Sequence, residues 1–206
     1  MLEFFIAALV IGIAPGPDNL FVLAQSATYG ARLGFCIILG LCTGIALQIC
    51  LLVAGVSALI AASPTAFFVI QCLGAAYLLY LAYKSFGVKV GTVEIDGDAI
   101  ESNNVPSARK LYLRGVIMNM TNPKVILFIL SLIPPAVRLD RQIHPSLQMA
   151  IFGAEFIVAT MIVFGSIALL AGTVKKYLLT SPKANRNLNW FSGCVFVLLA
   201  IALFVI

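Results

Sequence analysis

Charged side chains are scarce in this chain of 206 residues: they make up only 10% of it, and there is a single histidine, His144. An average soluble domain is about 25% charged. The sequence therefore has too few polar side chains to cover the surface of a water-soluble globule. This excludes an ordinary soluble domain, and with it a basic nucleic-acid-binding domain, although the formal net charge is +5.

Groupings typical of metal, redox or hydrolytic chemistry are also missing. The five cysteines form no CxxC pair, and all of them lie inside apolar runs. There is no HExxH motif, and the acidic pair at Asp96 and Asp98 lacks the remaining ligands of a calcium loop. We expect no metal site, no cofactor and no enzymatic activity.

Apolar residues dominate instead, at 62% of the chain, and the mean hydropathy is +1.08. A transmembrane helix needs about 20 mainly apolar residues. The sequence predicts an all-α polytopic membrane protein with six transmembrane helices. The first lacks the basic leader of a signal peptide, so we interpret it as a retained span. The predicted spans are Leu2 to Tyr29, Phe35 to Ala62, Ala66 to Phe86, Leu111 to Ala136, Leu147 to Gly172 and Leu188 to Ile206.

One connection differs from the others, because it is long, polar and acidic. It divides a single transmembrane domain, residues 1–206, into repeat one (1–86), a polar cytoplasmic linker (87–110) and repeat two (111–206). An odd number of spans in each repeat makes the two repeats inverted relative to each other. The acidic residues of the linker are Glu94, Asp96, Asp98 and Glu101.

Basic residues are unevenly shared between the two sides of the predicted bundle. Cytoplasmic loops carry an excess of Lys and Arg, so we expect the richer side to be cytoplasmic and both termini to face outward. The poorer side carries Arg138 and Arg141. The richer side carries Arg32, Lys84, Lys89, Arg109, Lys110, Arg114, Lys175, Lys176, Lys183 and Arg186.

Two predicted spans are interrupted near their centres. The first contains Pro15, Gly16 and Pro17, and the fourth contains Asn122 followed by Pro123. Proline removes a backbone donor and clashes with the preceding turn, and glycine allows the chain to unwind. Broken helices at matching positions in two repeats are the best sequence indication of a transporter binding site. We therefore predict that helices 1 and 4 are broken and line a shared cavity.

Buried charge accompanies both breaks. Asp18 follows the first and Lys124 the second, and each costs about 2.5–3.5 kcal/mol at mid-helix unless it is paired or hydrated. A half-helix N-terminus beside Lys124 suits a carboxylate, and Asp18 suits an ammonium group or a proton. The pair therefore fits a zwitterion such as an amino acid; the alternative is a structural ion pair. The predicted binding residues are Pro15, Gly16, Pro17, Asp18, Asn19, Asn119, Asn122, Pro123 and Lys124.

The spans also contain other polar and small residues, which can serve function or helix packing. Glu155 is a second candidate for proton coupling after Asp18, or a structural residue near the headgroups. Gln48 and Gln71 are adequately explained by hydrogen bonds between helices. Gly40 and Gly44 form a GxxxG pattern that indicates close helix packing.

The two motifs around the breaks resemble those of the LysE/RhtB-type translocators, the lysine-exporter and homoserine/threonine-efflux family. The matching stretches are PGPDNLFVLAQSATYGARLGF from Pro15 and RGVIMNMTNPKVILFILSLIP from Arg114. The resemblance covers essentially the whole chain. It implies a bacterial inner-membrane exporter with six helices, often a homodimer, that expels amino acids or related metabolites using the proton gradient.

Two other functions remain open on the residues. An ion or metal-cation exporter would need several carboxylates, imidazoles or thiolates to converge, and Lys124 would repel the cation. A membrane assembly subunit without transport activity would not depend on the buried charges once it had folded.

Overall fold

The computed structural model describes residues 2–14, 16–62, 64–87, 105–138, 142–173 and 182–205, and these contain helices and connections but no strand. Side chains in parts of residues 56–71, 182–188 and 202–205 are not described, and Gln71 and Lys183 are among them. The acidic linker residues and the basic residues Lys89, Arg141, Lys175 and Lys176 lie outside the described residues. The predicted all-α class is confirmed for the described part of the chain.

The helices follow the predicted apolar segments closely, with one helix pair at each predicted break. The first half contains α1 (Leu2–Ile13), α2 (Pro17–Tyr29), α3 (Ala31–Ala62) and α4 (Pro64–Gly87). The second half contains α5 (Ala108–Thr121), α6 (Pro123–Ala136), α7 (Pro145–Leu169) and α9 (Pro182–Val205). Proline opens α2, α4, α6, α7 and α9, since its fixed φ suits the first turn, where its missing N–H is not needed.

Close packing of α3 against α5 forms the tightest seam of the bundle, and three glycines make it possible. A Cβ added at Gly44 would lie 2.7 Å from Cβ of Asn119. One added at Gly40 or Gly115 would meet backbone atoms of the facing helix. The GxxxG prediction is therefore confirmed, and α5 is the partner. α3 also packs along α7, which in turn packs against α1 and α2.

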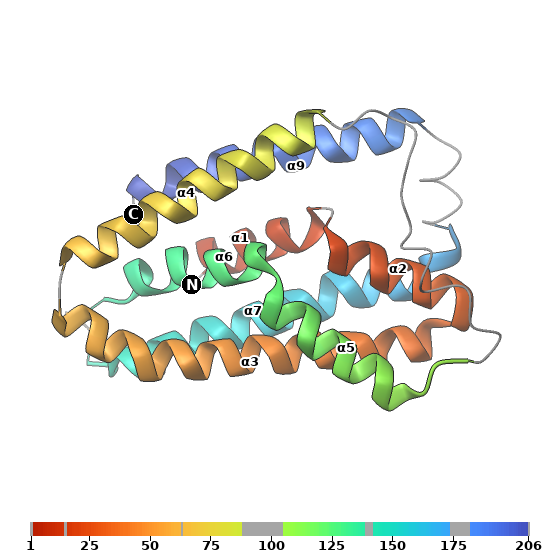
Figure 1. Cartoon of the computed structure of the whole chain (residues 1–206), viewed down its shortest axis with the longest axis horizontal. Coiled ribbons are helices and arrows are strands. Elements are labelled where there is room, and N and C mark those ends of the chain that lie inside the picture. Colours follow the sequence, from red (N-terminus) through yellow and green to blue (C-terminus); the bar gives the residue numbers. More distant parts are fainter. Residues whose placement is uncertain are drawn as a thin grey trace.

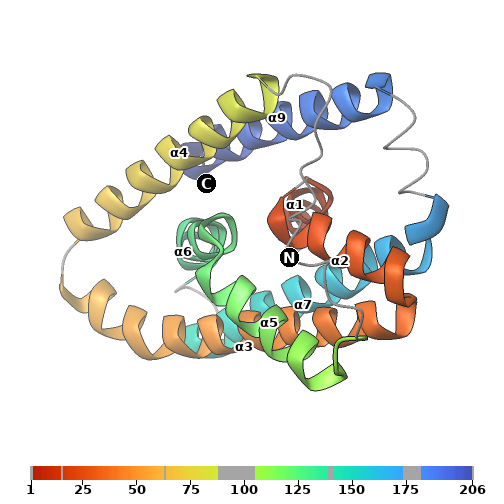
Figure 2. The same cartoon turned by 45° about the vertical axis from the view of Figure 1, so that its right-hand side comes forward.

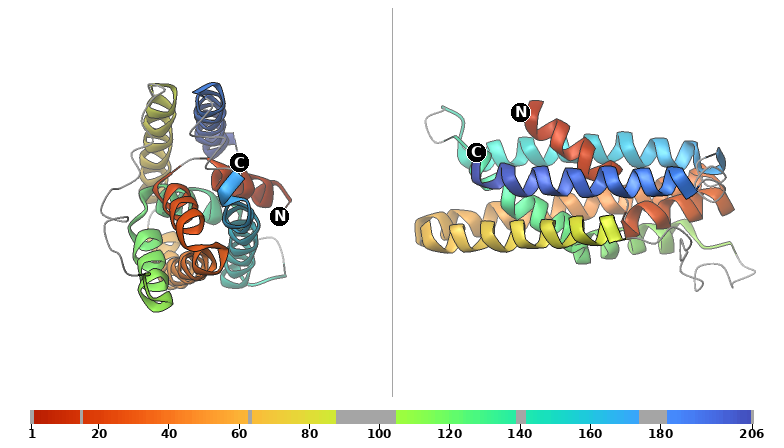
Figure 3. Two further views of the ribbon diagram at one scale, coloured as in Figure 1. Left: turned by 90° about the vertical axis from the view of Figure 1, so that its right-hand side faces the viewer. Right: turned by 90° about the horizontal axis from the view of Figure 1, so that it is seen from above.

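Helices α4 and α9 form a pair beside the rest of the bundle (Figures 1 and 2). The end-on view shows the two projecting away from the other helices (Figure 3). α4, from the first half, packs on α6 of the second, and α9, from the second half, packs on α1 of the first. α1 begins and α9 ends toward the same end of the molecule (Figure 1). The two sequence halves are thus interleaved.

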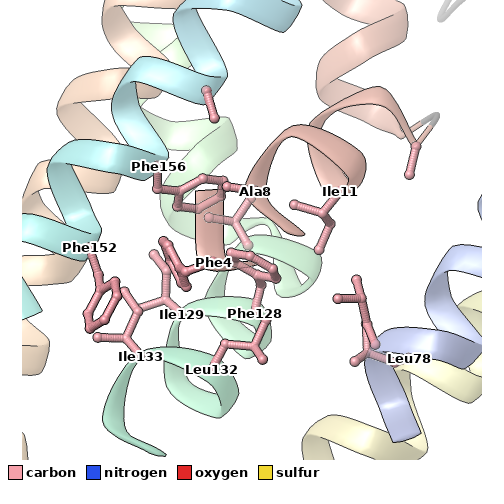
Figure 4. Close-up of a cluster of buried hydrophobic side chains, with 14 of the residues drawn as sticks. Phe4, Ala8, Ile11, Leu78, Phe128, Ile129, Leu132, Ile133, Phe152 and Phe156 are labelled. Carbon is pink, nitrogen blue, oxygen red and sulfur yellow. The ribbon is translucent and has the colours of Figure 1, made fainter. Parts of the chain in front are cut away.

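Two apolar clusters lie on either side of the helix breaks. The first, the aromatic cluster, joins α1, α6 and α7 around Phe4, Phe128, Phe152 and Phe156 (Figure 4). Ring centroids are 4.9 Å apart for Phe4 and Phe152, and 5.0 Å for Phe128 and Phe156. The second, the aliphatic cluster, joins α2, α3, α5 and α7 and includes Val22 and residues of α3.

Helix length and composition support membrane insertion. α3 and α7 each contain a stretch long and apolar enough to cross a bilayer, and each bent pair passes the same test when it is taken as one span. The described residues therefore contain two to four candidate spans by this measure. The arrangement of six spans in two inverted repeats stays a prediction.

Candidate functional site

Both predicted breaks are present, and they touch each other. The chain bends by 62° between α1 and α2 and by 56° between α5 and α6. Nδ2 of Asn122, at the second break, donates a hydrogen bond of 2.6 Å to Oδ2 of Asp18, in the first turn of α2. This contact joins residues 104 positions apart. The breaks therefore form one polar centre rather than two separate defects.

At the first break, side chains satisfy the free carbonyl groups at the end of α1. Nζ of Lys124 donates to the carbonyl oxygens of Ala14, at 3.0 Å, and Ile11, at 3.3 Å. Nδ2 of Asn19 donates to the carbonyl oxygen of Gly12 at 2.7 Å. Unwound backbone inside a bilayer needs such partners, because lipid offers none.

At the second break, amide side chains satisfy backbone N–H and carbonyl groups. Oδ1 of Asn122 accepts from the backbone N–H of Lys124 at 3.0 Å and so caps the start of α6. Nε2 of Gln48 donates to the carbonyl oxygen of Asn119 at 2.9 Å and lies 3.3 Å from its side-chain oxygen. Gln48 belongs to α3, so a residue of the first half supports the break in the second. The prediction that Gln48 bonds between helices is confirmed.

The two buried charges lie at helix ends of complementary sign. Asp18 and Lys124 are only 4% and 7% exposed. Asp18 lies in the first turn of α2, where the helix dipole favours a negative charge, and the Lys124 ammonium lies at the C-terminal end of α1, where it favours a positive one. Each group has hydrogen-bond partners of its own, and no direct ion pair joins these two side chains. Helix ends therefore offset part of the cost of burying both charges.

A cavity of about 20 Å³ lies between the breaks. Its polar lining comes from Asp18, Asn119, Lys124 and Thr160. A volume of that size holds about one water molecule, so this conformation leaves no room for an amino acid. Its apolar lining comes from Ile11, Leu41, Ile45, Val125, Phe156 and Phe164.

The structure brings most of the predicted binding residues together, but not all of them. Pro15 lies outside the described residues. Glu155 does not line the cavity, although the next residue, Phe156, does. Sequence reasoning missed Thr160, whose hydroxyl-bearing side chain gives no signal within an apolar run. It also missed the contact of Gln48 with the site, which no sequence pattern links to Asn119.

Metal-binding groups do not assemble in the part of the chain that the structure describes. No group of three or more His, Cys, Asp or Glu side chains there could hold a metal ion.

The family model for the LysE type translocator matches residues 9–205. The chain belongs to this family. Family membership makes it a bacterial membrane translocator of small molecules and not an enzyme.

Curated relatives cover the chain almost end to end. An uncharacterized membrane protein of Bacillus subtilis, YrhP, is 31% identical over 93% of this chain and 91% of its own length. A leucine efflux protein of Salmonella typhimurium is 30% identical over 94% of this chain and 89% of its own length. An uncharacterized membrane protein of Vibrio cholerae is 29% identical over 95% of this chain and 92% of its own length. No solved structure matches the chain.

Proposed function

We propose that this translocator exports a neutral amino acid across the bacterial inner membrane and couples export to proton entry. The observation that carries the proposal is the hydrogen bond between Asn122 and Asp18. It joins the two breaks beside a small cavity, which Asp18, Asn119 and Lys124 line. Substrate sites of secondary transporters lie at such breaks.

The lining of the cavity favours an uncharged aliphatic side chain. Most of the lining residues are apolar, and none of them offers a second carboxylate to a cationic substrate side chain. A relative that matches nearly the whole chain is named a leucine efflux protein, so leucine is the first substrate to test. The cavity must widen to admit it, because the present volume holds about one water molecule.

In the transport cycle we assign the carboxylate of the substrate to Lys124 and the adjoining amides. Asp18 meets the ammonium group or carries the proton, with Glu155 as the second candidate carrier. Two inverted repeats then expose the site alternately to each side. The contacts that support this pseudo-symmetry are α3 with α5 and α7 with α1, which are equivalent pairs if repeat one maps onto repeat two.

The membrane orientation follows from the distribution of basic residues, and we propose that both termini face the periplasm. Reporter fusions after Ala99 and after Ile206 should read cytoplasmic and periplasmic respectively. A cytoplasmic reading at Ile206 would contradict the orientation and remove the basis for inverted repeats.

Transport is tested by counterflow in proteoliposomes loaded with a panel of amino acids, with labelled leucine outside. We expect saturable uptake of leucine that empty liposomes do not show. Asp18→Asn keeps the shape of the side chain and its contact with Asn122 but removes its titration. It should lower acid-driven efflux by at least about tenfold, because the proton carrier is lost, while counterflow persists.

Two outcomes would contradict this proposal. No counterflow with any amino acid would remove the substrate assignment. Acid-driven efflux at the normal rate by Asp18→Asn, at a matched protein level, would show that Asp18 carries no coupling proton.

A further inference from the structure

The ammonium group of Lys124 has three N–H donors, and it uses two of them on the carbonyl groups at the end of α1. Nζ donates to the carbonyl oxygens of Ile11 and Ala14. Oδ1 of Asn19 is buried without a hydrogen-bond partner. A Cβ built on Gly16 would lie 3.6 Å from that oxygen and 3.1 Å from Nζ, so both atoms border the same small space. The surroundings are therefore suited to a cation with several N–H donors.

The α-ammonium group of an amino acid has the same three donors and the same charge as the end of a lysine side chain. We infer that the end of α1 is the ammonium subsite of the transporter, and that Lys124 occupies it as a tethered substitute while no substrate is bound. Its acceptors are the carbonyl oxygens of Ile11 and Ala14 together with Oδ1 of Asn19. This inference rests on the proposed function and specifies how that site is built.

The exchange of one ammonium group for another gives Lys124 two positions. In the structure it holds α6 against the end of α1, which ties the two sequence halves together at the site. A substrate ammonium group that takes over the carbonyl oxygens releases Nζ, which then meets the substrate carboxylate. Without substrate the subsite stays filled and the cavity stays small.

Gly16 leaves room beside the Lys124 ammonium group because it has no side chain. A methyl group at that position would approach Nζ to 3.1 Å, which is tighter than ordinary contact. A side chain at this position would therefore narrow the space beside the ammonium group.

The test replaces the ammonium group of the Lys124 side chain with that of a free amine. Lys124→Ala removes three carbons and the ammonium group, and n-propylammonium restores these atoms. The full-length variant in detergent is titrated with n-propylammonium chloride at constant ionic strength, and the thermal unfolding midpoint is followed. Propionate and 1-propanol are the ligand controls. Lys124→Met, whose stem still fills the space, and Lys110→Ala, at an exposed lysine, are the variant controls.

We expect n-propylammonium to raise the midpoint of Lys124→Ala by about 3–6 °C at ten times its Kd. The wild type and Lys110→Ala should shift by less than about 1 °C because the Lys124 ammonium group fills their subsite, and Lys124→Met should do the same because its stem blocks the entry of the amine. Equal shifts in all four proteins, or a preference for propionate, would overturn the inference.

Loss of two caps can also prevent Lys124→Ala from folding. Recovery of folded protein only when n-propylammonium is present during extraction would support the inference, because the amine replaces the missing caps. If no condition yields folded protein, the same titration is made with Lys124→Ser. Failure of both variants to respond to the amine, or to fold in its presence, would overturn it.

Failure here is distinguishable from failure of the proposed function. Wild-type counterflow of leucine with no amine response in the variants would leave transport standing and remove the subsite. A selective amine response without amino-acid counterflow would keep the subsite and remove the substrate assignment.

Discussion

At the break between α1 and α2, a charged side chain from the other half of the sequence caps the free carbonyl groups, whereas at the break between α5 and α6 every cap is a neutral amide. The first break depends on the Lys124 ammonium and on Asn19. The second depends on Asn122 within its own half and on Gln48 across the glycine seam. A charged cap can be exchanged for another charged group, such as a substrate, while the amide caps are held in a tightly packed seam. The comparison indicates that the first break is the working part of the site and the second its fixed frame.

Removing the charged cap should have the largest effect. Lys124→Met keeps the stem of the side chain but leaves the carbonyl groups of Ile11 and Ala14 unpaired, at a cost of about 1–3 kcal/mol for each buried acceptor. Leucine efflux should fall by at least about tenfold, because the ammonium group is also the proposed contact for the substrate carboxylate. Lys110→Met, at an exposed position, is the control. Efflux and thermal midpoints are measured at matched protein levels, and unchanged values for Lys124→Met would show that the two breaks do not differ in this way.

Opening the glycine seam should have an intermediate effect. Gly44→Ala places a methyl group 2.7 Å from Cβ of Asn119, so α3 and α5 must separate, at a cost of about 1–3 kcal/mol. Gly55→Ala, on the same helix with no atom within 4 Å of the added group, should be neutral or slightly stabilising. The unfolding midpoints of the two variants are compared in the same detergent. A midpoint for Gly44→Ala as high as that for Gly55→Ala would mean that the seam yields easily, and the second break would no longer count as a fixed frame.

Removing one neutral cap should have the smallest effect. In Gln48→Leu the carbonyl oxygen of Asn119 keeps its bond from the backbone N–H of Asn122, at 3.1 Å. We expect a loss of about 1 kcal/mol and leucine efflux within about twofold of normal. Leu47→Ala, at a neighbouring exposed position, is the matched variant. A loss of efflux as complete as that of Lys124→Met would make the two breaks equivalent.

Much of the fold could be predicted from local sequence, because it depends on local properties. Proline opens a helix where it stands, and about 20 apolar residues make a span wherever they occur. The breaks at Gly16 and Asn122 and the close packing at Gly44 were therefore predictable. The partner of that glycine was not, since any helix with a small residue would satisfy the pattern.

The site was harder to predict, because its bonds join residues far apart in the chain. Sequence reasoning placed Lys124 beside a half-helix N-terminus, ready for a carboxylate. In the structure its ammonium group instead contacts the C-terminal end of α1. There it donates to the carbonyl oxygen of Ile11, which is 113 positions away in the sequence. No local pattern reports that contact. Thr160 and the aromatic cluster escaped prediction for the same reason.

The hydrogen bonds between the two halves join residues that are synthesised at different times. Asp18 precedes its partner Asn122 by 104 residues, and Gln48 precedes Asn119 by 71. At about 5–20 residues per second, the first carboxylate waits on the order of 5–20 s before its amide partner is made. During that interval the first half carries an unpaired acid in or near the bilayer. Until the second half is inserted, Asp18 of the nascent chain therefore needs hydration by water or contact with an assisting protein.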